Sequence, residues 1–196
     1  MRRSGSIPLQ VLFLSLAIGC GVPDKPLQGL LESSFEPVRG GTGMVNDLLG
    51  ARATVLVTLD PECPFCQMYL PLLDSLVALP AYGAVRIVAV FASPYIPRDS
   101  AAKFMRASPA AFDGIMDPEF VLCKALGARV TPEVWSGCRR RLVYQGAIDD
   151  RALRAGKKRI QATRHYLSDA LDAVLRGDRP AEREVAAVGC ILEYDP

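Results

Sequence analysis

Two short apolar runs and the segment between them set the first part of the predicted fold. Residues 53–59 and 85–91 are β-branched and almost wholly apolar, a pattern typical of strands that are buried on both faces of a sheet. The intervening segment, from Cys63 to about Ala78, has a helical pattern, and a short helix is predicted over residues 97–105. We therefore expect two parallel strands joined by a crossover helix.

Capping residues indicate two further helices downstream. Asp117 is expected to cap a helix over residues 117–126, which Gly127 would end. Thr163 is expected to cap the last helix, where apolar residues recur at the helical spacing until Gly177.

Between these helices the pattern predicts an antiparallel hairpin. Residues 133–135 and 141–144 are the expected strands, and residues 136–139 the turn that joins them. Parallel strands with an added hairpin and helices predict a compact α/β sandwich built on a mixed sheet.

The first residues have the composition of an export signal. A short basic start precedes an apolar stretch, residues 7–19, that is too short to span a bilayer as a helix. The small residues before Cys20 resemble a bacterial lipobox, in which Cys20 would be acylated, although ordinary secretion also fits. The expected organisation is a signal peptide, a tether, a folded domain and a C-terminal tail, over residues 1–19, 20–34, 35–179 and 180–196.

The charge balance and the export signal bear on the partners and location of the protein. The 196 residues include 23 Lys and Arg against 21 Asp and Glu, a balance that gives no reason to expect nucleic acid as a partner. Export would place the chain on the periplasmic or cell-surface side of a bacterial membrane, held there by a lipid on Cys20. Disulfides persist in that environment.

The stretch Cys-Pro-Phe-Cys is the strongest chemical signal. Cys63 follows a buried strand and begins a helix, where free N–H groups and the helix dipole lower a thiol pKa from about 8.5 toward neutrality. Cys66 lies one turn later on the same face. Cys63 is therefore the candidate nucleophile and Cys66 the candidate resolving thiol of a redox pair.

Other uses of the pair fit less well. Zinc sites usually need four N or S ligands, and the chain has one histidine, His165, and no second C-x-x-C. A permanent Cys63–Cys66 bridge would close a very small loop and stabilise little. We expect no metal and no cofactor at this site.

Residues 54–59, the Cys-Pro-Phe-Cys motif and residues 67–76 resemble the active-site segment of thioredoxin-fold proteins, including the helix-kinking Pro71. Thr131 and Pro132 resemble that fold's cis-proline loop. The resemblance implies a thioredoxin-like three-layer sandwich with a central mixed β-sheet. It also implies that Thr131 and Pro132 bind the substrate backbone beside the cysteines.

Three later segments, residues 142–151, 166–175 and 187–191, are similar to the bacterial redoxin-domain, or thiol-specific-antioxidant-like, branch. This resemblance covers about residues 35–192. It implies a thiol–disulfide oxidoreductase that exchanges electrons with exported protein thiols or a partner dithiol protein. Two positions depart from the pattern: Val57 replaces a buried acid, and Glu62 replaces the tryptophan that often precedes the first cysteine.

Three cysteines have no assigned partner, and rival functions follow from the same motif. Cys123 and Cys138 would form one bridge, or Cys190 would act as a third redox cysteine, or Cys190 would be a small buried residue. A thiol peroxidase is a rival, although Asp60 stands where peroxiredoxins carry threonine. The other rival functions are copper delivery using His165 and a non-catalytic binding module with a redoxin fold.

Overall fold

The structure is a computed structural model that describes residues 33–49, 52–108, 112–138, 141–154 and 156–194. The export signal predicted for residues 1–19 and the acylation predicted at Cys20 lie outside the described residues. Among the described residues, none of the helices has the length and apolar character needed to cross a bilayer.

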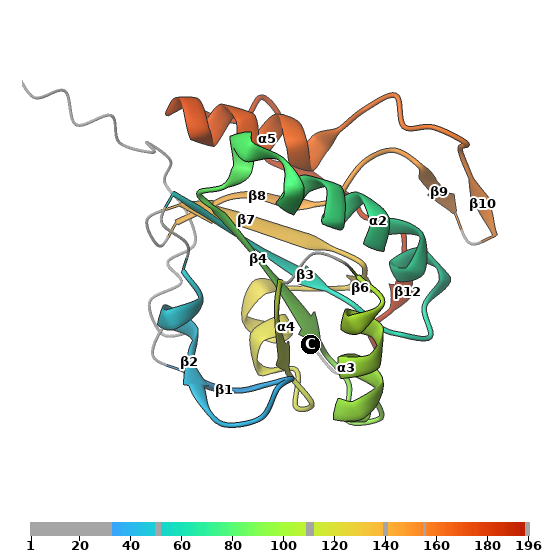
Figure 1. Ribbon diagram of the computed structural model, residues 1–196. Coiled ribbons are helices and arrows are strands. Elements are labelled where there is room, and N and C mark those ends of the chain that lie inside the picture. Colours follow the sequence, from blue (N-terminus) through green and yellow to red (C-terminus); the bar gives the residue numbers. More distant parts are fainter. Residues whose placement is uncertain (1–32, 50–51, 109–111, 139–140, 155, 195–196) are drawn as a thin grey trace, which may run out of the picture.

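A mixed sheet of eight strands forms the centre of the molecule, in the order β11-β8-β7-β3-β4-β5-β1-β2 (Figure 1). Its central strands β3 and β4 are parallel, whereas β3 and β7 are antiparallel. The strands of this sheet are β1 Ser34–Pro37, β2 Gly43–Met44, β3 Ala53–Thr58, β4 Val85–Phe91, β5 Asp113–Met116, β7 Val134–Cys138, β8 Arg141–Gly146 and β11 Glu184–Val185. The α/β fold with a central mixed β-sheet, predicted from the sequence, is confirmed.

Helices cover both faces of this sheet, and α2 and α5 lie together on the face opposite α4 (Figure 1). The helical elements are η1 Val45–Leu48, α2 Pro64–Ala78, η2 Pro80–Tyr82, α3 Arg98–Arg106, α4 Val121–Leu126 and α5 Tyr166–Arg176. The layers are therefore helix, sheet and helix.

The burial of the central strand β3 on both faces explains why its middle residues are apolar. Val55 and Val57 belong to the core cluster that includes α2 and α5, whereas Leu56 belongs to the cluster that includes α4. Alternate side chains of a strand point to opposite faces, so a strand covered on both sides favours apolar residues at successive positions.

Two small sheets lie beside the central one. The hairpin of β9, Ala152–Arg154, and β10, Lys157–Lys158, projects from the body of the molecule (Figure 1). The other sheet joins β6, Val130–Thr131, to β12, Cys190–Ile191, which are antiparallel although they are far apart in the sequence. The second pair brings the C-terminal tail onto the loop that contains Pro132.

Three local expectations were wrong. The helix predicted over residues 117–126 begins only at Val121, because Phe120 has a left-handed backbone with φ 57°. The strand predicted over residues 133–135 continues to Cys138, so the expected turn at 136–138 is strand instead. The last helix begins after His165 and is not capped by Thr163. The backbone N–H and the hydroxyl of Thr163 instead donate hydrogen bonds to the Asp150 carboxylate.

Candidate functional site

The first cysteine lies where a buried strand turns into a helix. β3 ends at Thr58, and Cys63 is the residue that caps the N-terminus of α2. Pro64 occupies the first helical position, where its missing N–H leaves no helical hydrogen bond unmade. The strand-to-helix placement predicted for Cys63 is confirmed, and both Cys63 and Cys66 are buried.

The thiol of Cys66 has two polar neighbours in otherwise apolar surroundings. The backbone N–H of Asp60 donates a hydrogen bond to its sulfur over 3.3 Å, and Thr131 Oγ1 lies 3.2 Å from the same sulfur. Burial raises the pKa of Cys66 to about 12, against the opposing effect of these two hydrogen bonds. Cys66 is therefore a protonated thiol at neutral pH.

The segment before Pro132 contacts both cysteines of the motif. The carbonyl oxygen of Thr131 lies 3.2 Å from Cys63 Sγ, and the hydroxyl of the same residue contacts Cys66. The peptide bond between Thr131 and Pro132 is cis. The structure thus brings together the four residues Cys63, Cys66, Thr131 and Pro132.

Neighbouring polar groups hold this loop in place. Thr58 Oγ1 donates to the carbonyl of Val130 over 3.0 Å and accepts the N–H of Glu133 over 2.9 Å. The Glu133 carboxylate accepts the backbone N–H of Arg129 over 2.9 Å. Burial raises the pKa of Glu133. The Thr58 hydroxyl is thus engaged with the loop that contains Pro132.

Cys63 is bonded to Cys190 rather than to Cys66. The two α-carbons of this disulfide are 6.2 Å apart, although 127 positions separate the residues in the sequence. Cys66 carries a free buried thiol. Cys123 is also free, so the bridge considered between Cys123 and Cys138 is absent. The alternative in which Cys190 is only a small buried residue is wrong, because Cys190 is half-buried and disulfide-bonded.

Residues after Cys190 anchor the tail against α4 and the loop that follows it. Leu192 donates its backbone N–H to the carbonyl of Arg129 over 3.0 Å. The ring of Tyr194 lies 5.0 Å from that of Phe120, centroid to centroid, and its hydroxyl donates to the carbonyl of Ala128. Sequence reasoning missed these anchors. The short apolar run Cys190–Leu192 is the strand signal by which the pairing with β6 could have been found.

A buried polar cluster joins the cysteine-bearing helix to the segment before the β9–β10 hairpin. Tyr69, one turn after Cys66, donates its hydroxyl proton to Asp149 Oδ1 over 2.7 Å. Arg151 Nε donates to Asp149 Oδ2 over 2.7 Å, and its guanidinium lies 4.9 Å from the centre of the Tyr69 ring. Arg151 thus connects the segment before the hairpin to α2.

The remaining sequence candidates lie in different surroundings. Val57 is fully buried in the core, whereas Glu62 and His165 are exposed. His165 precedes the first residue of α5. Within the described part of the chain, no group of three or more His, Cys, Asp or Glu side chains is placed to hold a metal ion.

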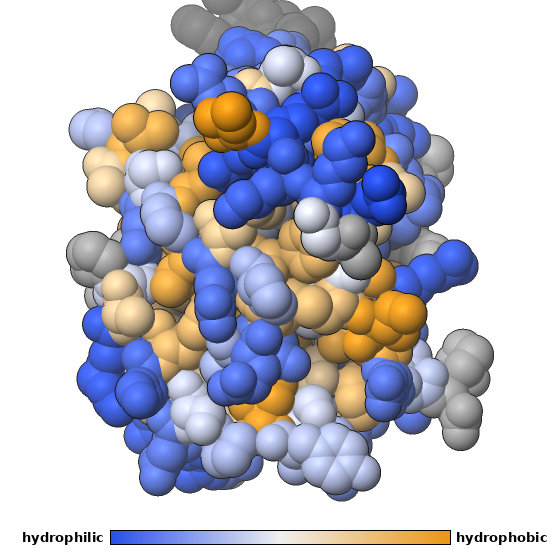
Figure 2. Space-filling model, turned by 90° about the vertical axis from the view of Figure 1, so that its right-hand side faces the viewer, coloured by the Kyte–Doolittle hydropathy of each residue, from blue (hydrophilic) through white to orange (hydrophobic). Residues whose placement is uncertain are grey.

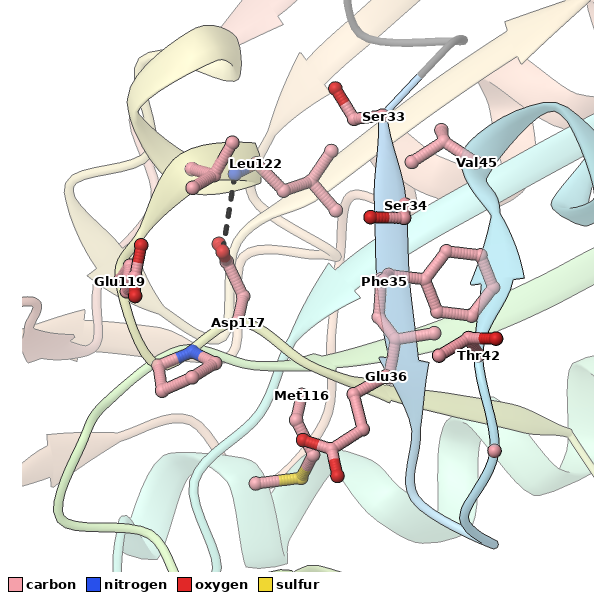
Figure 3. A pocket seen from close by; sticks show the side chains of 14 residues that line it. Ser33, Ser34, Phe35, Glu36, Thr42, Val45, Met116, Asp117, Glu119 and Leu122 are labelled. Atoms are coloured by element: carbon pink, nitrogen blue, oxygen red, sulfur yellow. Dashed lines mark hydrogen bonds between the residues drawn. The ribbon is translucent and has the colours of Figure 1, made fainter.

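A separate cavity of about 360 Å³ lies between β1 and the start of α4 (Figure 3). Glu36 and Asp117 are among the residues that line it, but the Asp117 carboxylate accepts the N–H groups of Leu122 and Cys123. None of the residues that line it is a cysteine or a histidine. The cavity is therefore distinct from the cysteine site.

The side of the molecule that carries β12 and the β9–β10 hairpin is shown in Figure 2. Apolar side chains are concentrated across the middle of this face, where a few polar side chains interrupt them, and the upper part is mostly polar. Ile191, the residue after the disulfide-bonded cysteine, is 78% exposed. A second polypeptide approaching this face would meet apolar surface.

Comparison with known proteins shows the fold. No protein-family model and no curated protein matches the chain. Among solved structures, a hypothetical protein from Sinorhizobium meliloti superposes with a TM-score of 0.75 at 23% identity, over 88% of this chain and 94% of that one.

Two further structures relate the fold to better-described proteins. A thioredoxin-like protein from Aeropyrum pernix matches with a TM-score of 0.52 at 18% identity, over 61% of this chain and 83% of that one. A putative thiol:disulfide interchange protein DsbE from Chlorobium tepidum matches with a TM-score of 0.52 at 19% identity, over 62% and 82%. The fold is thioredoxin-like.

Proposed function

We propose that the chain is a thiol–disulfide oxidoreductase that exchanges electrons with exported protein thiols or with a partner dithiol protein. Cys63 is the sulfur that exchanges, Cys66 is the resolving thiol, and Thr131 and Pro132 hold the substrate backbone. One observation carries the proposal: Cys63 is already bonded to a cysteine of an extended segment that pairs with Thr131.

That observation has the geometry of a captured substrate. Cys190 lies opposite Thr131 in an antiparallel pair while its sulfur is joined to Cys63. A cysteine in an extended polypeptide that paired with β6 as the tail does, backbone against backbone, would meet the same sulfur. The similarity to a protein described as a putative thiol:disulfide interchange protein supports the same chemistry.

The reaction balances in two exchange steps. The Cys63 thiolate attacks one sulfur of a substrate disulfide, and the other substrate sulfur leaves as a thiolate and takes up a proton. Cys66, once deprotonated, attacks Cys63 Sγ, which forms the Cys63–Cys66 disulfide and releases the second substrate thiol. The substrate gains the two electrons that the chain loses, and a partner dithiol protein returns the chain to its reduced form.

The electrostatic surroundings assign different roles to the two cysteines. The N-terminal end of α2 stabilises a thiolate on Cys63, the residue that caps it. Cys66 lies deeper and its pKa is raised to about 12. Cys63, at the helix N-terminus, therefore attacks first, and the Cys66 thiol resolves the mixed disulfide.

We further propose that residues 1–19 direct export and that Cys20 carries a lipid. This would place the domain on the periplasmic or cell-surface side of a bacterial membrane. The apolar stretch and small residues before Cys20 support this location.

A trapping experiment tests the proposed chemistry. Because both Cys66 and Cys190 can displace a substrate from Cys63, the trap is the double variant Cys66→Ser/Cys190→Ser. Offered a disulfide-containing protein, it should form a stable mixed disulfide through Cys63. The matched control adds Cys63→Ser and should form none. Equal capture by both variants would contradict the role of Cys63.

A redox titration separates exchange from a structural bridge. A reversible two-electron midpoint between about −120 and −270 mV, the range of known exchange proteins, is expected. A disulfide that resists reduction below about −300 mV would support a non-catalytic binding module instead.

A further inference from the structure

The residue before the disulfide-bonded cysteine is in unusually close contact with another backbone. A β-carbon built on Gly189 would lie 2.7 Å from the carbonyl carbon of Thr131, closer still to its oxygen, and 3.2 Å from the nitrogen of Pro132. Cβ atoms essentially never approach other heavy atoms this closely. Glycine in an extended segment often marks such an approach of one backbone to another.

The obstructing atoms belong to backbone that cannot move aside cheaply. The neighbouring carbonyl of Val130 accepts the hydrogen bond from Thr58, and the Thr131 carbonyl oxygen lies against Cys63 Sγ. A flexible side chain could rotate away from an added methyl group, but here the strand itself would have to shift. That shift would alter the register that sets Cys190 opposite Thr131.

The position after the cysteine is not restricted in this way. Ile191 lies opposite Val130 in the strand pair, yet its side chain is 78% exposed. The site therefore excludes a side chain on the residue before the bound cysteine and tolerates a bulky side chain on the residue after it.

From this asymmetry we infer that the site selects substrate cysteines that directly follow a glycine. The inference rests on the proposed function, and residues 189–190 are the resident example of the preferred Gly–Cys segment. A substrate polypeptide replaces the tail on β6, its Gly–Cys backbone passes Thr131, and its sulfur reaches Cys63 Sγ. A side chain in place of the glycine hydrogen keeps the sulfur out of reach.

The direct test compares two peptides that differ by one methyl group. Cys63 of the full-length Cys66→Ser/Cys190→Ser variant is first loaded with thionitrobenzoate, and mass spectrometry confirms the position. A peptide thiolate then attacks Cys63 Sγ, the coloured thionitrobenzoate anion leaves, and a peptide–Cys63 disulfide forms. The peptides are the acetylated amides Ala-Val-Gly-Cys-Ile-Leu and Ala-Val-Ala-Cys-Ile-Leu.

The rate of thionitrobenzoate release by each peptide is divided by the rate at which the same peptide reacts with free Ellman's disulfide in solution. This ratio corrects for any difference in the intrinsic reactivity of the two peptide thiols. The tail of the variant competes equally with both peptides. We expect the Gly–Cys peptide to react at least tenfold faster. Equal rates, both above that of β-mercaptoethanol, would overturn the selectivity but leave the exchange function standing. Peptides no faster than β-mercaptoethanol would overturn both.

A variant in the tail gives an independent test. Gly189→Ala in the otherwise native chain should lower the oxidised fraction bridged between Cys63 and Cys190 at least tenfold, measured by peptide mapping in a thiol–disulfide buffer. Val188→Ala, which shortens the neighbouring side chain, is the matched control and should keep the bridge. Equal bridging in both variants would overturn the inference.

Discussion

Cys190 lies directly opposite Thr131 in the antiparallel pair of β12 and β6, while its sulfur is bonded to Cys63. Thr131 also places its hydroxyl 3.2 Å from the free thiol of Cys66. One residue of the Pro132 loop therefore contacts or pairs with all three cysteines. In the proposed exchange, Cys66 and Cys190 are alternative partners for the Cys63 sulfur.

Removing the tail cysteine should move the disulfide. In an oxidised Cys190→Ser variant we expect Cys63 to be bonded to Cys66, because Cys66 lies three positions further along α2 and shares the Thr131 contact. Peptide mapping of alkylated protein measures the change. Cys123→Ser is the control, since Cys123 carries a free thiol elsewhere, and it should keep the Cys63–Cys190 bridge. A Cys63 that stays reduced in Cys190→Ser would contradict the exchange.

Attack by Cys66 should be strongly dependent on pH. Burial raises the pKa of Cys66 to about 12, so the thiol form dominates at neutral pH and thiolate increases as pH rises. In a Cys190→Ser variant with thionitrobenzoate on Cys63, release of the anion by Cys66 should accelerate about tenfold per pH unit between about pH 7 and pH 10. Cys66→Ser in that background should abolish this release. A plateau near pH 8 would show that the pKa is not raised.

The Thr131 hydroxyl should assist Cys66. Its hydrogen bond lowers the pKa of Cys66 against the effect of burial, so Thr131→Val should raise the pKa further and slow the attack. Loss of one hydrogen bond of about 1 kcal/mol corresponds to a rate about fivefold lower. The same anion-release measurement reports it. Thr131→Ser retains the hydroxyl and should react near the native rate, whereas equal slowing of both variants would point to the backbone instead.

The link between α2 and the β9–β10 hairpin should contribute to stability. Tyr69→Phe removes the proton donor to the buried Asp149 carboxylate and should lower the free energy of unfolding by about 1 to 3 kcal/mol. Fluorescence of Trp135, the single tryptophan, follows unfolding in urea because this side chain is buried.

Tyr82→Phe is the matched control for that measurement. The Tyr82 hydroxyl donates to Asp172 over 2.8 Å, but Asp172 is exposed and water can replace the lost donor. Tyr82→Phe should therefore lower the free energy of unfolding by about 1 kcal/mol or less. A Tyr69→Phe cost no larger than that of Tyr82→Phe would contradict the role of the buried cluster.

Local patterns were sufficient for the elements that surround the first cysteine. The apolar run of β3 and the helical pattern after Cys63 are consequences of neighbouring residues alone, and the structure has both where they were predicted. The ends at Gly127 and Gly177 follow equally from local chemistry, since both glycines have positive φ. The predicted start of the helix at residue 117 was wrong because Phe120 adopts a left-handed backbone conformation that its residue type does not favour.

The sequence by itself determined the α/β pattern and the position of Cys63 and Cys66 at the start of a helix, because these depend on contacts between near neighbours. Only the tertiary structure decided that Cys63 is bonded to Cys190 and that the bridge from Cys123 to Cys138 does not form. The Cys63–Cys190 bond spans 127 positions and requires β12 to pair with β6. No local preference encodes such a contact, because it forms only when the folded sheet and the Pro132 loop present a strand on which the tail can lie.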